Sequence, residues 1–324
     1  MARPRLMPLL AVSLLLAACG GTPSPAPEDT RRAFTPIAEG LIHGISYGPF
    51  REGQRPGGPD PTPDQIAEDL RIIAQHWSMM RVYSSRGPTA HMLRIIREEQ
   101  LPLKVMLGAW IAPDDEPANA AEVEQAIALA RAYPDIVVAV SVGNESQVFW
   151  SGHRTPQAIL LKHLRAARAG IRQPVTTADD YNFWNKPEAA PVAAEVDFLL
   201  LHAYAMWNGI SLEEAVPWTA GIVDDIQARH PTLPIVLGET GWATTLDPNG
   251  DEIQHIKAPA GEAEQTRFHD AFKAWAAERK QPYFYFEAFD EPWKGSDSPL
   301  EVEKHWGLFR VDRTPKPAMA GEGK

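Results

Sequence analysis

Two short apolar runs, each leading to a glutamate, dominate the hydrophobic pattern of this chain. Residues 137–142 lead into Gly-Asn-Glu at 143–145, and residues 235–237 lead into Gly-Glu at 238–239. Continuous Val, Ile and Leu runs are typical of strands buried on both faces, as in parallel sheets. Carboxylates at the carboxyl ends of such strands lie where α/β barrels carry out their chemistry. The pattern therefore predicts a pair of carboxylates, Glu145 and Glu239, at one end of a parallel barrel.

Strand-like segments alternate with amphipathic helical patterns along most of the chain. The predicted strands are residues 43–47, 79–84, 103–109, 136–142, 175–178, 198–203, 235–238 and 283–289. The predicted helices are residues 63–76, 89–99, 120–133, 156–171, 212–230 and 262–279. Between the fifth and sixth strands, residues 187–195 have room only for a short helix. Eight such units predict a single α/β domain, a closed (β/α)8 TIM barrel.

The first residues predict a secretion signal. Two arginines precede an apolar run over residues 6–18, and small residues lead directly to Cys19. The run is shorter than the ~20 residues that span a bilayer. Residues 1–18 resemble the signal peptide of bacterial lipoproteins, with Cys19 lipidated. An ordinary secretory signal is the alternative. Gly20 after the cysteine favours an outer-membrane or surface anchor.

The remaining boundaries follow from composition. Residues 19–37 are rich in proline and polar residues and predict a tether, followed by a catalytic domain over 38–316 and a tail over 317–324. Cys19 is the only cysteine, so neither an internal disulfide nor a thiolate metal cluster is available.

The net charge argues against two classes of partner. Without residues 1–18 the chain carries 29 Lys and Arg against 42 Asp and Glu, a net charge of −13. Such a surface repels nucleic acid and anionic lipid but is compatible with a neutral sugar polymer.

Aromatic residues gather in the segments that follow the predicted strands. Rings stack on the apolar faces of sugars, so their position at one end of the barrel predicts a saccharide-binding surface, with core packing as the alternative for each ring. They are Trp110, Phe149, Trp150, Tyr181, Trp184, Trp207, Trp242 and Trp293.

Glycosidic bond cleavage explains why two carboxyls would meet. The leaving oxygen needs a proton donor, and the positive sugar centre needs a carboxylate; a separation of about 5–5.5 Å indicates retention through a covalent intermediate. Glu145 and Glu239 lie three β/α units apart, which places them on strands four and seven, across the barrel mouth from one another.

Several motifs carry a resemblance to one family. Gly-Asn-Glu at 143–145 resembles the acid/base motif of glycoside hydrolases that act through strands four and seven. Within that clan the chain resembles family 17, the β-1,3-glucanases and glucan transferases. The matching segments are residues 43–48, 80–83, 238–242, 286–294 and 306–309, in the expected order.

The resemblance implies roles for individual residues. Glu145 becomes the acid/base and Glu239 the nucleophile, with helix capping as the alternative for each. Asn144 would donate to the sugar 2-hydroxyl. Because Glu145 must be protonated at rest, we expect the nearby negative charge of Glu239 to raise its pKa.

Further residues are expected around this pair. Glu291, Lys294 and Glu303 match a group that organises the site, the lysine positioning Glu239; a surface salt-bridge network is the alternative. Tyr47, Tyr83 and Tyr204 stand at strand ends, where their hydroxyls bond the nucleophile or the sugar, or else pack into the barrel wall. Trp110, Trp207 and Trp242 are expected to contact substrate.

Other polar residues in the strands are given structural roles. Arg81 lies inside a strand and predicts an internal ion pair. His43 and His202 lack metal-ligand spacing and are interpreted as satisfied barrel histidines, so no metal and no cofactor is expected.

Together these observations predict a retaining glycoside hydrolase of the cell envelope, anchored by lipid and acting as a monomer on β-1,3-glucan. A β-1,3-glucan transglycosylase with the same glutamates and a non-catalytic glucan-binding lipoprotein are the alternatives.

Overall fold

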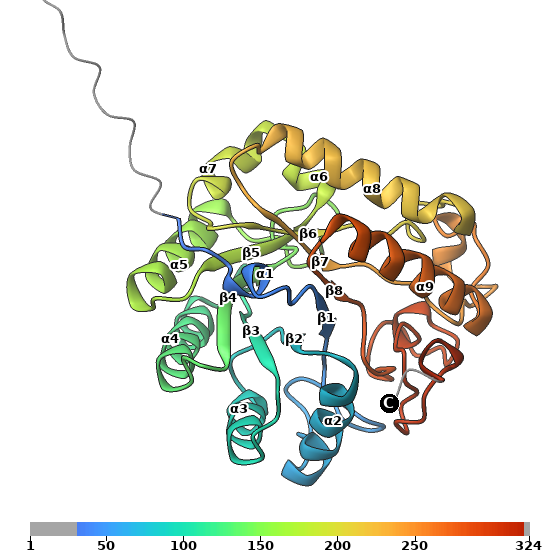
Figure 1. Cartoon of the computed structure of the whole chain (residues 1–324), viewed down its shortest axis with the longest axis horizontal. Helices are drawn as coiled ribbons and strands as arrows, with labels where there is room; N and C mark the ends of the chain where they lie inside the picture. The colour runs from blue at the N-terminus through green and yellow to red at the C-terminus, as the bar shows by residue number, and fades with distance from the viewer. Residues whose placement is uncertain (1–30, 321–324) are drawn as a thin grey trace, which may run out of the picture. The chain divides into compact units, whose positions relative to one another are not determined.

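In the computed structural model, which describes residues 31–320, eight parallel strands pair in sequence order and close into a barrel (Figure 1). The last strand pairs with the first, which closes the ring. The strands are β1 (His43–Ser46), β2 (Met79–Arg81), β3 (Lys104–Ala109), β4 (Val137–Asn144), β5 (Val175–Asp180), β6 (Leu199–His202), β7 (Ile235–Glu239) and β8 (Tyr283–Tyr285). The predicted TIM barrel is confirmed.

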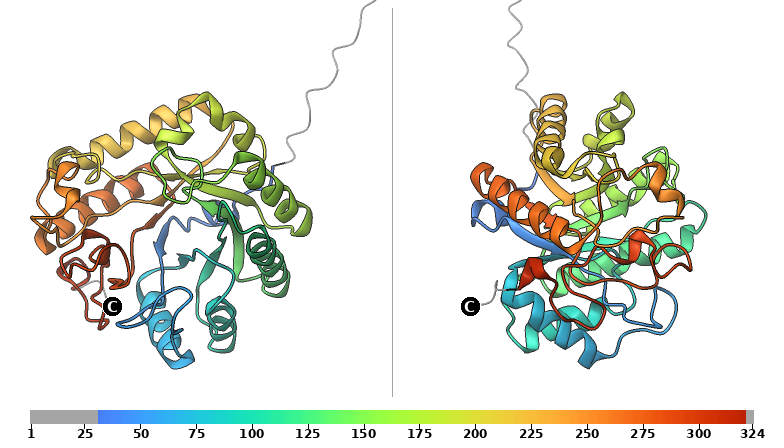
Figure 2. Two further views of the ribbon diagram at one scale, coloured as in Figure 1. Left: turned by 180° about the vertical axis from the view of Figure 1, so that it is seen from behind. Right: turned by 90° about the vertical axis from the view of Figure 1, so that its right-hand side faces the viewer.

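Helices surround the strands on the outside (Figure 2). The long ones are α2 (Pro63–His76), α3 (Thr89–Glu98), α4 (Glu116–Ala132), α5 (Gln157–Gly170), α8 (Leu212–Arg229) and α9 (Glu262–Arg279). α2 begins with a capping box between Thr62 and Gln65. The β5–β6 link holds only short pieces, α6 (Tyr181–Trp184), η1 (Pro187–Ala189) and α7 (Ala190–Ala193). No helix within residues 31–320 has the length and apolarity needed to cross a membrane.

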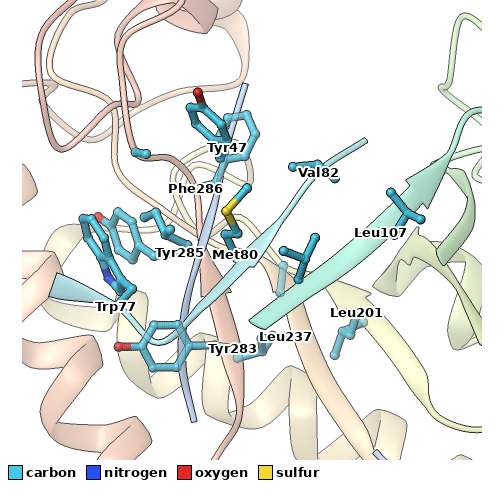
Figure 3. Packing of buried hydrophobic residues seen from close by; sticks show 14 of the residues in the cluster. Tyr47, Trp77, Met80, Val82, Leu107, Leu201, Leu237, Tyr283, Tyr285 and Phe286 are labelled. Atoms are coloured by element: carbon cyan, nitrogen blue, oxygen red, sulfur yellow. The ribbon is translucent and has the colours of Figure 1, made fainter. Parts of the chain in front are cut away.

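Successive side chains along each strand point alternately to the outside and the inside of the barrel, which produces two apolar layers. Met80, Leu201 and Leu237 belong to the large layer between strands and helices, part of which Figure 3 shows. Their neighbours belong to a smaller layer that fills the barrel; it comprises Phe34, Met79, Met106, Ala139, Ala178, Phe198, Leu200, Val236 and Phe284. This inner layer forms the apolar floor of the barrel.

The N-terminal end of the domain lies earlier than predicted. Phe34 is buried, and its ring stacks on that of Phe198 with centroids 4.9 Å apart. The backbone N–H of Arg32 donates to Asp197 Oδ1 at 2.9 Å, just before β6. Residues 31–37, assigned above to the tether, are therefore bound to the barrel, with α1 (Thr35–Ala38) close behind. The predicted signal peptide, Cys19 and the first part of the tether lie outside the described residues.

The C-terminal boundary is also wrong. η4 (Pro317–Met319) follows the predicted domain end, yet Ala318 and Met319 are buried. Residues 317–320 therefore belong to the domain, and the rest of the predicted tail lies outside the described residues.

A buried ionic cluster ties the two ends of the domain together. Asp69, fully buried on α2, accepts two hydrogen bonds from Arg313, at 2.8 and 2.7 Å, and one from Arg51 at 2.7 Å. The Tyr47 hydroxyl donates to the same carboxylate at 3.0 Å. Tyr47 was predicted to bond the nucleophile or the sugar, but its hydroxyl is committed to Asp69 in the barrel wall.

We expect Asp69→Asn to lower the free energy of unfolding by about 3–5 kcal/mol, because it leaves the buried guanidinium of Arg313 without its carboxylate partner. Urea denaturation followed by tryptophan fluorescence measures the loss. Glu99→Gln at the exposed Arg71–Glu99 pair is the matched control and should change the midpoint little. Equal losses in the two variants would contradict this role for Asp69.

Candidate active site

The two glutamates emerge at the same end of the barrel. Glu239 is the last residue of β7, and Glu145 directly follows β4. The pairing of β4 with β5 shifts between Ser141 and Asn144, where Gly143 has φ +79° and Glu145 itself φ +46°. A left-handed conformation at a non-glycine residue is uncommon and typical of functional sites. This local bulge turns the Glu145 side chain toward the barrel axis.

The structure brings the two carboxyls together. Glu145, Glu239 and His202 each contribute one side-chain oxygen or nitrogen to a group whose atoms all lie within 4.8 Å of one another. One oxygen of Glu145 and one of Glu239 therefore lie within 4.8 Å of each other, which is consistent with the ~5–5.5 Å carboxyl separation of retaining enzymes and shorter than the ~6.5–9.5 Å of inverting ones. Both side chains are largely shielded, with exposed fractions of 17% for Glu145 and 6% for Glu239.

Strand alternation places two polar side chains directly above the apolar floor. Arg81 is two residues after Met79 on β2, and His202 is two residues after Leu200 on β6, so each faces the barrel interior. Both are buried. Arg81 and His202 therefore lie between the apolar floor and the two glutamates, Arg81 in contact with Glu239 and His202 in contact with Glu145.

Glu239 is held from several sides. Its Oε1 accepts from Arg81 Nη1 at 2.7 Å and from the Tyr83 hydroxyl at 3.0 Å, and its Oε2 accepts from the Tyr204 hydroxyl at 2.7 Å. The predicted internal ion pair of Arg81 is confirmed, and its partner is Glu239. Tyr83 and Tyr204 therefore bond the carboxylate as predicted, and this network fixes its position.

His202 links the two carboxyls. Its Nδ1 lies 2.8 Å from Glu145 Oε1, and its Nε2 lies 3.2 Å from Arg81 Nη1 and 3.4 Å from Glu239 Oε1. Burial lowers the pKa of His202 to about 4, so the ring is neutral near pH 7.

Asn144 is oriented by the same arginine. Its Oδ1 accepts from Arg81 Nη2 at 2.6 Å, which leaves the amide NH2 as the group available to a ligand. This orientation suits the predicted hydrogen bond to a sugar hydroxyl.

The surroundings push the pKa values of the two glutamates apart. Burial, together with the negative charges of Glu239 and Asp180, raises the pKa of Glu145 well above its usual value, as expected. Burial opposes ionisation of Glu239 too, but His202, Arg81 and the two tyrosine hydroxyls bring its pKa below the usual value. One carboxyl is therefore protonated and the other ionised in the same small space, the arrangement that an acid and a nucleophile require.

A second ionic group lies on the segment after β8. Lys294 Nζ contacts both oxygens of Glu287, at 2.8 and 2.7 Å, and Glu291 Oε2 at 2.8 Å. Glu287 and Glu291 are buried, so this is not a surface network. The lysine was predicted to position Glu239, but Arg81 takes that place. Glu303 interacts with Lys294 through its charge. Burial raises the pKa of Glu303 to about 7, and the positive charge of Lys294 opposes this rise.

The three tryptophans predicted to contact substrate divide into two kinds. Trp110 and Trp207 are partly exposed beyond β3 and β6. Trp242 is fully buried, donates its Nε1–H to Pro259 O at 3.1 Å and packs on Phe268. It belongs to the core, because the segment after β7 turns its indole away from the mouth and against α9.

The donor set at the mouth is also one that a metal ion can use, namely Glu145, His202 and Glu239. Arg81 already lies on two of these groups, 2.7 Å from Glu239 Oε1 and 3.2 Å from His202 Nε2. A dication would therefore compete with a fixed guanidinium, and the donor set fits that guanidinium better.

Two residues of the site were missed from the sequence. His202 was interpreted as a barrel histidine, although a polar residue that follows three leucines at a strand end was a usable signal. Glu287 lies beside the predicted Glu291 and Lys294 and was not singled out. The only sequence signal for Glu287 was the pattern Phe-Glu-Ala-Phe, in which a single charged residue stands between aromatic residues.

Comparisons with known proteins agree with this geometry. Residues 44–307 match the BtgE/BtgC glycoside hydrolase domain. A glucan 1,3-beta-glucosidase of Arthroderma benhamiae is 31% identical over 81% of this chain and 86% of its own length. A probable glucan endo-1,3-beta-glucosidase btgC of Aspergillus clavatus is 27% identical over 80% of this chain, but the match covers only 39% of that longer protein.

Two solved structures share the fold. An endo-laminarinase from Formosa Hel1_33_131 superimposes with a TM-score of 0.76, at 27% identity and 86% coverage of each chain. An active-site mutant of a Rhizomucor miehei beta-1,3-glucanosyltransferase, in complex with laminaritriose, gives a TM-score of 0.67 at 25% identity, covering 86% of this chain and 96% of its own. With the domain match spanning most of the chain, this protein belongs to the BtgE/BtgC glycoside hydrolase family.

Proposed function

We propose that this enzyme cleaves β-1,3-glucan with retention of configuration. The observation that carries the proposal is the close carboxyl pair, Glu145 and Glu239, with their pKa values displaced in opposite directions. The substrate class is supported by the names of the relatives and by the laminaritriose complex. A non-catalytic glucan-binding protein would have no need to keep both carboxyls in this state.

The reaction follows in two balanced steps. The ionised Glu239 attacks the anomeric carbon while the carboxyl proton of Glu145 passes to the leaving sugar oxygen and the glycosidic bond breaks. Glu145, now ionised, takes a proton from water, whose oxygen bonds the anomeric carbon as the Glu239 ester breaks. His202 and Arg81 hold the two carboxyls in place throughout and transfer no proton themselves.

Transfer to a second sugar is the alternative that one comparison favours. The Rhizomucor miehei glucanosyltransferase shares the fold over 96% of its own length and 86% of this chain. In that outcome a sugar hydroxyl replaces water in the second step, and the same glutamates serve. Nothing in the first step changes.

Incubation with laminarin oligosaccharides separates these activities. Shorter products with new reducing ends indicate hydrolysis, and products longer than the substrate indicate transfer. Proton NMR of the first-formed anomer tests retention: a β product is expected, and an initial α product would overturn the proposal. Binding without any new product would identify the non-catalytic alternative.

The pH dependence of kcat/KM on these substrates is expected to be bell-shaped. The rate falls as the pH drops through the lowered pKa of Glu239, which must be ionised. It also falls as the pH rises through the raised pKa of Glu145, which must be protonated. Glu303→Gln is the control, since the pKa of Glu303 is about 7. Loss of the basic limb in that variant would reassign the limb to Glu303.

We further propose that Cys19 carries the lipid that holds the enzyme in the cell envelope as a monomer. The support is the signal-like segment before Cys19 and the absence of any other cysteine. Cells expressing the full chain are labelled with a clickable fatty acid. Label on the wild type but not on Cys19→Ser is expected, with the variant released from the membrane fraction. An unlabelled wild type would indicate an ordinary secretory signal.

A further inference from the structure

Two aromatic side chains next to the general acid are left exposed by the fold. Phe149 and Trp150, four and five residues after Glu145, have exposed fractions of 72% and 50%, higher than any other large hydrophobic side chain among the described residues. Adjacent exposed aromatics are unfavourable in water and are typical of binding surfaces.

The loop that carries them has a fixed base. The backbone N–H groups of Gln147 and Val148 donate to the buried carboxylate of Asp179, at 2.8 and 3.1 Å. The loop is closed by Thr155 N donating to Ser146 O at 2.8 Å. Only the tip between these anchors is exposed, so the two rings are presented from a rigid frame, which reduces the entropy lost on binding.

The same loop is continuous with the catalytic residues. His153, on its returning arm, makes a 2.7 Å hydrogen bond from Nε2 to the backbone oxygen of Asn144. Its ring lies 4.7 Å from that of Trp110, centroid to centroid. The rings of His153 and Trp110 therefore lie beside the residue that precedes the general acid, and His153 belongs to the loop that carries Phe149 and Trp150.

We infer that Phe149 and Trp150 form the platform for the sugar chain on the leaving-group side of the bond, which is also the side from which an acceptor sugar enters. The inference rests on the proposed function. The general acid must lie beside the leaving oxygen, so the loop that continues from Glu145 flanks the departing chain. A neutral glucan presents apolar sugar faces that match two exposed rings.

In the second step the platform favours a sugar over water. A bound acceptor chain holds its hydroxyl at the anomeric carbon; its oxygen forms the new bond as the Glu239 ester breaks, and its proton passes to Glu145. Occupancy of the platform raises the local concentration of acceptor, so the platform sets the ratio of transfer to hydrolysis.

The test compares two substrates in the double variant Phe149→Ala/Trp150→Ala. β-Laminaribiosyl fluoride has a leaving group that reaches no platform, whereas a laminarin hexasaccharide does. We expect kcat/KM on the hexasaccharide to fall at least about tenfold, equivalent to about 1.4 kcal/mol, and fluoride release to stay within about twofold. Any transfer products should fall relative to hydrolysis products.

Ile253→Ala, which truncates a side chain of 41% exposure in the loop between β7 and α9, is the matched control and should match the wild type on both substrates. Equal losses on both substrates, or none, would overturn the inference. So would unchanged kinetics with loss of binding to lipid vesicles, which would make the rings a membrane contact. A wild type inactive on both substrates would instead refute the proposed function.

Discussion

Glu239→Gln is expected to reduce kcat on laminarin oligosaccharides by about 10⁴-fold or more. The amide has nearly the same shape, so it can still accept from Arg81, but it cannot form the glycosyl ester. Binding of the oligosaccharide, measured by calorimetry, should persist because the sugar contacts are untouched. Loss of the charge beside Arg81 should also lower the melting temperature without unfolding the protein at 25 °C.

Azide distinguishes this interpretation from simple damage to the site. In Glu239→Ala the small anion can enter the vacated space and attack in place of the carboxylate, giving an α-glycosyl azide from an activated β-glycoside. Asp251→Asn, at an exposed acid of the loop after β7, is the control and should behave as the wild type. Substantial activity in Glu239→Gln would exclude it as the nucleophile.

Glu145→Gln should show an effect that depends on the leaving group. Natural glucan needs a proton at the departing oxygen, so its cleavage should slow by about 10²–10⁴-fold. A dinitrophenyl glycoside needs no such proton, and its first step should proceed nearly unimpaired. The second step lacks its base, so a burst of dinitrophenolate followed by slow turnover is expected in stopped-flow measurements.

Added azide also tests the assignment of Glu145 as the acid/base. Azide needs no general base, so it should restore turnover of Glu145→Gln and yield a β-glycosyl azide, opposite in configuration to the product of Glu239→Ala. Equal losses on glucan and on the dinitrophenyl glycoside would show that Glu145 supports the fold or binding and does not serve as the acid.

The parts of the fold that repeat along the chain were predictable. α2 and α9 have the predicted bounds. For α2 the reason is a clear start signal, Thr62 before Pro63, followed by a sustained amphipathic pattern. The meeting of Glu145 and Glu239 was predictable because parallel strands end at a common edge. Strand alternation, applied one step further, would also have placed Arg81 and His202 inside the barrel beneath them.

Contacts between distant segments could not be predicted in this way. The bond from Tyr47 to Asp69 depends on Arg313, 244 residues from Asp69, and no local pattern reports that pairing. Trp242 ends the segment 238–242 that contains Glu239, yet it is buried against Phe268 on α9. In the supposed tether, Phe34 was hidden among proline and polar residues because a single aromatic is too weak a signal.

The burial of Phe34 separates the entry of the chain from the place where glucan would bind. The chain enters the barrel at the amino-terminal ends of the strands, beside Phe198, whereas Glu145 and Glu239 stand at the carboxyl ends. The entry segment around Phe34 therefore does not narrow the approach to the two glutamates.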